Sequence, residues 1–582
     1  APPSPVNLKP GPAPWETRED GSVVISAGDR LPPVGWSQVL CNENFGWITD
    51  ETGDGFLWDG GNSRENRLTP WANDPLAVGG PEKIVVNLNG REYSIFADGD
   101  GHPCSVTYRP GLAQWEKRIG PVLLTTQGFV PWDRDCRVLR VTLSGGSGVL
   151  SCRLDGREEA ARPIGDGQTL ALVTQGQGGR PVYHFEEGEF LPEQEETVER
   201  WEEKVSSLKV FTPDEGLNRY LNSWCLYQVI ACRLMARTSQ YQNGGAFGFR
   251  DQLQDVLALV YTWPARAREQ LLLAASRQFE EGDVQHWWHP PEGAGVRTRI
   301  SDDLLWLPWV LCRYCQTTGD WEILEEQVPY LTSKPLGPEE GDRYEIPQAS
   351  QKVESLYSHA LAAIRHALGR GTGAHGLALM GTGDWNDGMN RVGEKGRGES
   401  VWLTWFLAAV LQAFSPVCER MGDREAAREC LERADQLMEA AQKSWDGGWY
   451  RRGYYDDGAP LGSAQSQACQ LDSIAQSFSV FPRGTDRERA NQAVSAALER
   501  LFDRENGVVR LFDPAFDGGE EEPGYIKAYP AGVRENGGQY THGAVWLAIA
   551  CFRLNRPREG WAVLRALLPQ GHPTKAYRGE PY

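Results

Sequence analysis

The first third of the chain alternates between apolar and polar positions over short runs. Between Ser22 and about Tyr183, such runs are separated by turns of Gly, Pro and Asp; examples are SVVIS, EKIVVNL, REYSIFA, GPVLLTTQGFV, CRVLRVTLS and TLALVTQ. A period of two places every second side chain on the same face of a strand. Short strands at this spacing predict an antiparallel β-sandwich over residues 1–185.

An acidic run, EEGEFLPEQEETVERWEEK, follows at Glu186–Lys204. Its charges would cover most of a helical surface and it has few apolar anchors, so we expect an acidic, solvated helical linker over residues 186–212.

Beyond Thr212 apolar residues recur at intervals of three and four, as on one face of an α-helix. Gly, Pro, Asp or Ser bounds each segment. The predicted helices cover residues 215–236, 251–262, 265–280, 301–318, 320–331, 352–370, 401–421, 423–445, 467–480, 485–501, 538–555 and 557–568. About twelve helices can pair and close into an (α/α)6 barrel over residues 213–582. The expected fold is therefore multidomain α+β: an N-terminal antiparallel β-sandwich, a helical linker and an (α/α)6 barrel.

Composition narrows the kinds of partner. The 582 residues include 59 Lys and Arg against 79 Asp and Glu, a net charge of −20. Nucleic-acid binding needs a basic face, so nucleic acid is not an expected partner. The 22 Trp and 65 Gly supply flat platforms and tight turns. They predict a loop-built pocket for a flat, polyhydroxylated ligand.

The sequence predicts a soluble, cytoplasmic protein that does not bind a membrane. Its twelve Cys lack a disulfide spacing, as expected of buried thiols in a reducing compartment. The N-terminus has no basic region and no apolar run, so no signal peptide is expected. The longest apolar runs, near Leu304–Cys312 and Thr404–Phe414, are shorter than the ~18–20 residues that span a bilayer.

No metal site is predicted. Cys312 and Cys315 form a CxxC without a second pair, and His286 and His289 lack the HExxH spacing. The DGDGH at Asp98–His102 lacks the downstream Glu of a calcium loop and favours a hairpin turn.

The first candidate loop is YQNGGAFGFRDQLQD, Tyr241–Asp255. After a glycine-rich approach, Arg250, Asp251 and Asp255 stand at the start of a helix, where paired Arg and Asp can grip sugar hydroxyls. The alternative is an ordinary ion pair that caps the helix.

The second loop is GTGDWNDGMN, Gly381–Asn390, which places Asp384 and Asp387 around Trp385 and Asn386. An indole face stacks on a pyranose ring, and a nearby carboxylic acid can protonate a glycosidic oxygen. The alternative is a loop chosen for turn chemistry.

The third loop is YIKAYPAGVRENGGQYTH, Tyr525–His542. Its polar groups surround Gly537 and Gly538, whose backbone N–H groups can approach an anion closely. The alternative is a polar loop that leads into a helix beginning near Gly538.

The fourth segment is EGDVQHWWHPPEGAGVRTRISDDLLWL, Glu281–Leu307. Its paired Trp and flanking His residues can form the wall of a sugar subsite; these are His286, Trp287, Trp288 and His289. We interpret Asp302 as a helix N-cap.

With NENFGW and NSRENRLTPWANDP, between Asn42 and Pro75, these blocks occur in one order along nearly the whole chain. Together they resemble glycoside hydrolase family 94, the inverting cellobiose and chitobiose phosphorylases. The resemblance is strongest to its β-1,2-glucan branch, which contains 1,2-β-oligoglucan phosphorylase and the phosphorylase domain of cyclic β-1,2-glucan synthase.

The resemblance implies that Asp387 is the general acid and that Arg250, Asp251 and Trp385 hold the sugar that loses its leaving group. Other residues match the contacts to the leaving-group sugar (Arg534, Glu535) and to phosphate (Arg237, His542). With the polar groups of the loops, the expected substrate-binding set is Arg250, Asp251, Trp385, Asn386, Arg534, Glu535 and Gln539. The expected phosphate-binding set is Arg237, His542, Gly537 and Gly538.

The implied reaction is reversible, inverting phosphorolysis of β-glucosides, in particular β-1,2-glucooligosaccharides, to α-glucose 1-phosphate and a shortened acceptor. Phosphate is then a co-substrate and no cofactor is needed. The resemblance also implies a homodimer. Two alternatives stay open: an inverting hydrolase on the same barrel, with Glu535 or Asp255 as base, and a non-catalytic glucan-binding domain that regulates chain length in a larger synthase.

The sequence departs from the family pattern at two places. Gly245 stands in a shortened loop where the cellobiose branch has an Arg, which makes cellobiose specificity doubtful. The family continues with a Thr–Gly segment that completes its phosphate site, whereas this sequence stops at Glu580–Tyr582. We therefore expect a domain that ends early or a different phosphate site.

Overall fold

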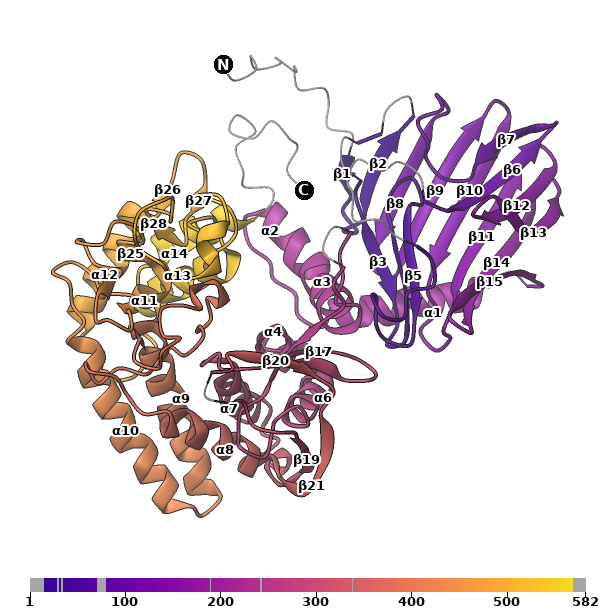
Figure 1. Cartoon of the computed structure of the whole chain (residues 1–582). Coiled ribbons are helices and arrows are strands. Elements are labelled where there is room, and N and C mark those ends of the chain that lie inside the picture. Colours follow the sequence, from indigo (N-terminus) through magenta and orange to yellow (C-terminus); the bar gives the residue numbers. More distant parts are fainter. Residues whose placement is uncertain are drawn as a thin grey trace. The chain divides into compact units, whose positions relative to one another are not determined.

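The computed structural model describes residues 15–28, 31–32, 35–70, 80–188, 190–240, 243–337 and 339–568. They form two compact units (Figure 1). The first comprises the chain up to Phe247 and His289–Gly293; the second comprises Gly248–Trp288 and the chain from Ala294. Several expectations concern residues outside this description. They are the N-terminus, residues 71–75 of the segment NSRENRLTPWANDP, Tyr241 and Gln242 of the first candidate loop, and the C-terminal end at Tyr582.

The first unit is built on antiparallel sheets. The eight-stranded sheet has the order β1 (Trp15–Thr17), β2 (Val23–Ala27), β8 (Cys104–Arg109), β9 (Leu112–Ile119), β10 (Val122–Phe129), β11 (Arg137–Ser144), β14 (Gln168–Gln177), β15 (Arg180–Glu186). A four-stranded sheet has the order β13 (Arg157–Ile164), β12 (Gly148–Leu154), β6 (Glu82–Leu88), β7 (Arg91–Ser94). A third contains β3 (Gln38–Cys41), β4 (Phe45–Thr49) and β5 (Gly55–Asp59). The predicted N-terminal β-sandwich is confirmed.

The core of this unit follows from the period of two. Along β8 buried positions alternate with half-buried ones, and Val106 points into a core that it shares with Val86 of the four-stranded sheet. Trp47 and Trp115 lie in the same core with their ring centroids 6.1 Å apart. One apolar face per sheet is thus sufficient to close the sandwich.

The acidic run forms α1 (Leu191–Val205), as predicted, but it is not fully solvated. Trp201 is buried, and a side chain at Gly111 would collide with its ring. Gln194 accepts a hydrogen bond from Arg140 of β11 at 2.8 Å. The sequence interpretation was wrong here because a single buried Trp and a polar anchor are enough to dock an otherwise charged helix.

Helical residues then run without interruption through α2 (Glu215–Arg219), η1 (Tyr220–Trp224), α3 (Cys225–Gln228) and η2 (Val229–Met235), of which η1 and η2 are π-helical. The α-helices of the second unit are α4 (Phe249–Asp255), α5 (Leu259–Thr262), α6 (Pro264–Ala275), α7 (Trp306–Thr318), α8 (Leu356–Gly369), α9 (Val401–Arg420), α10 (Arg424–Gln442), α11 (Ser473–Phe478), α12 (Arg487–Arg500), α13 (Thr541–Arg553) and α14 (Pro557–Leu567).

The second-unit helices pack in two rows. Alternate helices contact one another in sequence: α4 against α7, α7 against α9, α9 against α11, and α11 against α13. Each of α7, α9, α11 and α13 also packs against a following helix, which is α8, α10, α12 or α14. Helix α9 has mean hydropathy 1.6 over an 18-residue window, so it is long and apolar enough to cross a membrane, but 83% of that window is buried inside the protein. It is a buried helix that packs against α7, α10 and α11.

Three predicted helices differ from the structure. Residues 320–331 form a short 3-10 turn, η4 (Glu322–Glu325), and a strand, β19 (Gln327–Thr332), which pairs with β21 (Gln348–Ser355). Strand β21 also takes the start of the segment predicted at 352–370, so α8 begins only after Ser355 caps it. The segment predicted at 467–480 is helical only in α11.

Candidate active site

Helix α4 carries the last residues of the first candidate loop, which belong to the second unit. It begins directly after Gly248, where a Cβ would lie 2.6 Å from the Asp251 carboxylate, so the close approach requires glycine. Arg250, in the first turn, is buried. A buried guanidinium needs acceptors for its donors, and this one has three hydrogen-bond acceptors and one further carboxylate nearby.

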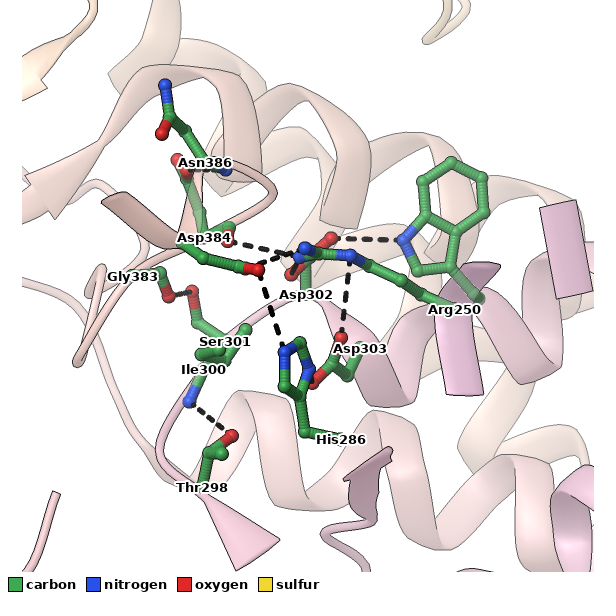
Figure 2. A network of polar contacts seen from close by, with 12 residues as sticks. Arg250, His286, Thr298, Ile300, Ser301, Asp302, Asp303, Gly383, Asp384 and Asn386 are labelled. Carbon is green, nitrogen blue, oxygen red and sulfur yellow. Dashed lines mark hydrogen bonds and ion pairs between the residues drawn. The ribbon is translucent and has the colours of Figure 1, made fainter. Parts of the chain in front are cut away.

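Arg250 is the centre of a network of carboxylates (Figure 2). Nη1 donates to Asp302 Oδ1 at 2.9 Å and to the backbone carbonyl of Asp384 at 3.2 Å. Nη2 donates to Asp387 Oδ1 at 2.6 Å, and Nε lies 3.7 Å from Asp303 Oδ1. The first and second candidate loops therefore meet at this side chain, and the alternative of a simple helix-capping ion pair does not describe it.

A second buried ion pair supports the loop that carries Asp387. Arg452 donates to both carboxylate oxygens of Asp384, at 2.6 and 2.7 Å, and lies 3.2 Å from Asp472. Ser400 donates to Asp384 at 2.6 Å. The other Asp384 oxygen accepts from the backbone N–H of Asn386. Asp384 is thus an anchor, and it shapes the turn that follows.

Asp387 opens the short 3-10 turn η5 (Asp387–Met389), with 32% of its side chain exposed. Its second oxygen lies 3.6 Å from Nε2 of His286. Partial burial raises the pKa of Asp387, but Arg250 and His286 lower it further, so the net pKa is below its ordinary value. Burial lowers the pKa of His286, whereas Asp303 and Asp387 raise it well above its ordinary value. At neutral pH the pair is a carboxylate beside an imidazolium.

The interpretation of Asp302 as an N-cap is wrong. Asp302 precedes the 3-10 turn η3 (Asp303–Leu305), but its side chain caps no backbone N–H. One oxygen accepts from Arg250, and the other accepts from the Trp306 indole at 3.0 Å. Burial, partly opposed by Arg250, raises the pKa of Asp302 to about 7. A long-range ion pair has replaced the local cap that its sequence position suggested.

A cavity of about 1550 Å³ extends from Asp387 and His286. Trp287 forms part of its wall, as predicted, and its ring centroid lies 5.9 Å from that of Tyr344. Trp288 is 1% exposed, with Arg277 over its ring, so it belongs to the core and not to the wall. The cavity is also lined by Arg299, Leu336, Glu340, Arg370, Thr382, Asn390, Lys395 and Tyr525.

Trp385 packs into an aromatic cluster at the start of α13. Its ring centroid lies 5.1 Å from that of Tyr540, 5.0 Å from that of Trp546 and 6.0 Å from that of His542. The second and third candidate loops are therefore neighbours. Only 5% of Trp385 is exposed, which leaves little ring area for stacking on a sugar.

Several groups of the third loop have structural partners. Gln539 accepts from the backbone N–H of Val509 at 2.8 Å, and the Gly537 N–H donates to the Glu535 carbonyl at 2.9 Å. A Cβ at Gly538 would lie 2.6 Å from the Arg534 carbonyl, so this close turn requires glycine. The Arg534 side chain is 53% exposed, and its Nε lies 3.4 Å from Glu535.

Asn386 and Arg237 are placed differently from the charged network. Asn386 is buried, its amide has no hydrogen-bond partner among the described residues, and it points away from Arg250 (Figure 2). Arg237 belongs to the first unit, has φ 47°, and donates from Nε to the Ala246 carbonyl at 2.7 Å.

Two family models match the chain. The catalytic domain of the glycosyl hydrolase 94 superfamily matches residues 200–582, and the glycosyl hydrolase 94 supersandwich domain matches residues 21–149. The chain belongs to glycosyl hydrolase family 94. The family suggested by the sequence motifs is confirmed, and both halves of the chain share it.

Individual relatives within family 94 cover different parts of the chain. Cyclic β-(1,2)-glucan synthase NdvB of Rhizobium meliloti (strain 1021) is 36% identical over 97% of this chain and 24% of the relative. The 3-O-β-D-glucopyranosyl-β-D-glucuronide phosphorylase of Paenibacillus borealis is 33% identical over 64% of this chain and 46% of the relative. The 1,2-β-oligoglucan phosphorylase of Listeria innocua serovar 6a is 25% identical over 34% of this chain and 18% of the relative. The chain spans less than half of the length of each.

Sequence reasoning missed three parts of this family 94 site. Asp303 and Arg452 were not singled out, and His286 was assigned only to a subsite wall. The pattern SDD before an apolar helix is one signal that could have identified Asp303 as a site residue, because two adjacent carboxylates rarely both cap one turn. Arg452, in the loop after α10, carries no local signal at all. Its role depends on a partner that is distant in sequence.

Proposed function

We propose that this chain is an inverting glycoside phosphorylase that acts on β-linked glucooligosaccharides. Asp387 gives a proton to the glycosidic oxygen as its bond to C1 breaks, and a phosphate oxygen forms the new bond to C1 from the opposite face. The products are α-glucose 1-phosphate and a shortened acceptor. The observation that carries this proposal is one partly exposed carboxylate, Asp387, that faces a large cavity while cations hold it.

The surroundings of Asp387 favour phosphate over water as the nucleophile. An inverting hydrolase needs a second carboxylate about 6.5–9.5 Å away that is free to activate water. In the described chain, Asp387 forms ion pairs with two cations, Arg250 at 2.6 Å and His286 at 3.6 Å. Of the nearby carboxylates, Asp302 and Asp303 are tied to Arg250 and His286. Phosphate is already anionic and needs no base, only charge compensation and alignment.

The lowered pKa of Asp387 bears on the direction of the reaction. The free enzyme holds Asp387 as a carboxylate, which is the form that accepts the proton of an acceptor hydroxyl in the synthesis direction. Phosphorolysis requires the protonated form. A phosphate anion bound nearby would raise the pKa of Asp387, because a like charge disfavours ionisation. Binding of phosphate before the bond breaks would therefore favour the protonated form of Asp387, which is the general acid.

Cavity size supports an oligosaccharide substrate. A volume of about 1550 Å³ exceeds the roughly 300–1,000 Å³ of ordinary small-ligand sites. The β-1,2 linkage is proposed from the names of two relatives, the cyclic β-(1,2)-glucan synthase and the 1,2-β-oligoglucan phosphorylase. The two rows of helices support the predicted (α/α)6 barrel. The homodimer and the cytoplasmic location stay predictions.

The test is release of α-glucose 1-phosphate from β-1,2-glucooligosaccharides with and without phosphate. We expect strictly phosphate-dependent release. Glucose release without phosphate would favour the hydrolase alternative, and binding of glucan without any product would favour the non-catalytic domain. Reverse synthesis from α-glucose 1-phosphate with sophorose, laminaribiose, cellobiose and glucose as acceptors then identifies the linkage.

A further inference from the structure

His286 lies between two carboxylates from different segments. Its Nδ1 lies 2.8 Å from Asp303 Oδ2, and its Nε2 lies 3.6 Å from Asp387 Oδ2. Asp303 is 2% exposed and the His286 side chain is 16% exposed. The imidazole therefore joins a fixed, buried carboxylate to one that borders the cavity (Figure 2). His286 itself lines the cavity.

The orientation of this ring is determined by its surroundings. His286 is part of β17 (Gln285–His289), which belongs to a sheet with β18 (Ala294–Thr298) and β20 (Asp342–Glu345). The strand fixes the backbone, and Asp303 fixes the ring through Nδ1. A carboxylate at Nδ1 also favours a proton on that nitrogen. Nε2 is thereby directed toward Asp387.

We propose that His286, oriented by Asp303, is a positioning residue for Asp387: its imidazolium keeps the Asp387 carboxylate ionised and aimed at the cavity between turnovers. This proposal rests on the proposed function, in which Asp387 exchanges a proton with the glycosidic oxygen. His286 acts through Asp387 and forms no bond with substrate.

The charges around His286 support this role. The groups that face it are Asp303 from η3, Asp387 from η5 and, bridging both, Arg250 from α4. Arg370, which also lines the cavity, donates only to the backbone carbonyls of residues 299 and 300 among the bonds of the described chain. Without the imidazolium, the carboxylates of Asp302, Asp303 and Asp387 would share the single guanidinium of Arg250, and the pKa of Asp387 would rise because it loses one of two nearby cations.

The experiment replaces His286 and follows the protonation of Asp387 through the pH–rate profile. The rate measured is kcat/KM for synthesis from α-glucose 1-phosphate, which requires the Asp387 carboxylate in the free enzyme. In His286→Gln we expect the acidic limb of the kcat/KM profile to move to higher pH by about one pH unit or more. The second ionisation of a phosphate monoester near pH 6 belongs to the substrate and contributes equally to every enzyme compared.

A second variant and a matched control separate this role from loss of structure. Asp303→Asn leaves the imidazole in place but removes the carboxylate that orients it, so we expect the same limb to move upward by less than in His286→Gln, because loss of the Asp303 charge itself favours the Asp387 carboxylate. The control is His375→Gln, because His375 also pairs through Nδ1 with a carboxylate, Glu399, at 2.5 Å, and it does not line the cavity. Its limb should coincide with that of the wild type.

A readout independent of turnover decides the proposal even if the enzyme proves inactive. The carboxyl of Asp387 can be titrated by ¹³C NMR in the full chain, with its signal assigned by its loss in Asp387→Asn. We expect this carboxyl to titrate at higher pH in His286→Gln. A lower rate at every pH with the limb and the NMR titration unmoved would overturn the proposal and leave His286 a purely structural residue. Absence of glucose 1-phosphate turnover in the wild type, together with a shifted titration, would instead count against the proposed function alone.

Discussion

Arg452 and Asp384 form a two-point ion pair beneath the loop that carries Asp387, with N–O distances of 2.6 and 2.7 Å and neither side chain exposed. A buried pair of this kind contributes little net stability over an apolar pair, but removing one partner leaves an uncompensated charge. The pair therefore acts mainly by fixing the turn between Asp384 and Asp387.

Removal of the guanidinium should be costly. We expect Arg452→Ala to lower the free energy of unfolding by about 3–5 kcal/mol, because Asp384 and Asp472 would lose their shared cation. Urea unfolding measures this. The neighbouring Arg451→Ala is the control, since Arg451 is partly exposed beside Asp446 and should cost about 1 kcal/mol. Equal losses for the two variants would contradict the assignment of Arg452 as the anchor.

Asp387→Asn should abolish most activity and preserve the fold. An amide cannot donate or accept the proton, and general acid–base assistance typically supplies about 10²–10⁴-fold. The measurements are kcat in both directions and the melting temperature. If the variant retained more than about a tenth of kcat, Asp387 would not be the acid.

The two adjacent tryptophans give opposite predictions. Trp288→Ala should destabilise the protein by about 3–5 kcal/mol, because Trp288 is fully buried. Trp287→Ala should alter stability little but raise KM for oligosaccharide acceptors by about two- to tenfold, the equivalent of one aromatic contact. Denaturation and acceptor kinetics on both variants test this. A KM change confined to Trp288→Ala would mean that the wall is assigned incorrectly.

Asp302 predicts a pH dependence of stability. Its pKa is about 7 in the folded protein and about 4 in an unfolded chain, so the folded state keeps the proton that the unfolded state releases. The stability that this group contributes is therefore full below pH 4 and is lost as pH rises through 7. We expect the difference in unfolding free energy between wild type and Asp302→Asn to fall over that window. A difference that is constant with pH would contradict the raised pKa.

The local periodicity of apolar residues predicted much of this fold. The period of two along β8 and β10, and the period of three to four along α9 and α10, are repeated locally and depend little on distant partners. The helix prediction for residues 320–331 was wrong because Val328 and Leu331 are three apart, as on one face of a helix, whereas the strand buries both through a register shift between Pro329 and Leu331. Pairing with β21, which no local pattern reveals, decides in favour of the strand.

The site was predictable only where its chemistry is local. The motif around Asp387 could be read directly, because Trp, Asn and two Asp in a glycine-rich turn are uncommon without a use. Asp302 was misread since a helix start offers a plausible local partner, whereas its actual partner, Arg250, is 52 residues away. Charge networks are assembled by folding, and a sequence shows their members without their pairings.

The cavity wall includes His286 and Asp387 of the charged network but also residues outside that network. Arg250, Asp303 and Asp387 stand on helical turns and are fixed by buried contacts. Much of the wall comes instead from the connection between β19 and β20, including Leu336 and Glu340. Under the proposed function, we expect exchange of this connection between relatives to change acceptor preference and to leave the proton chemistry unaltered, because Arg250, Asp303 and Asp387 pair with one another and with His286.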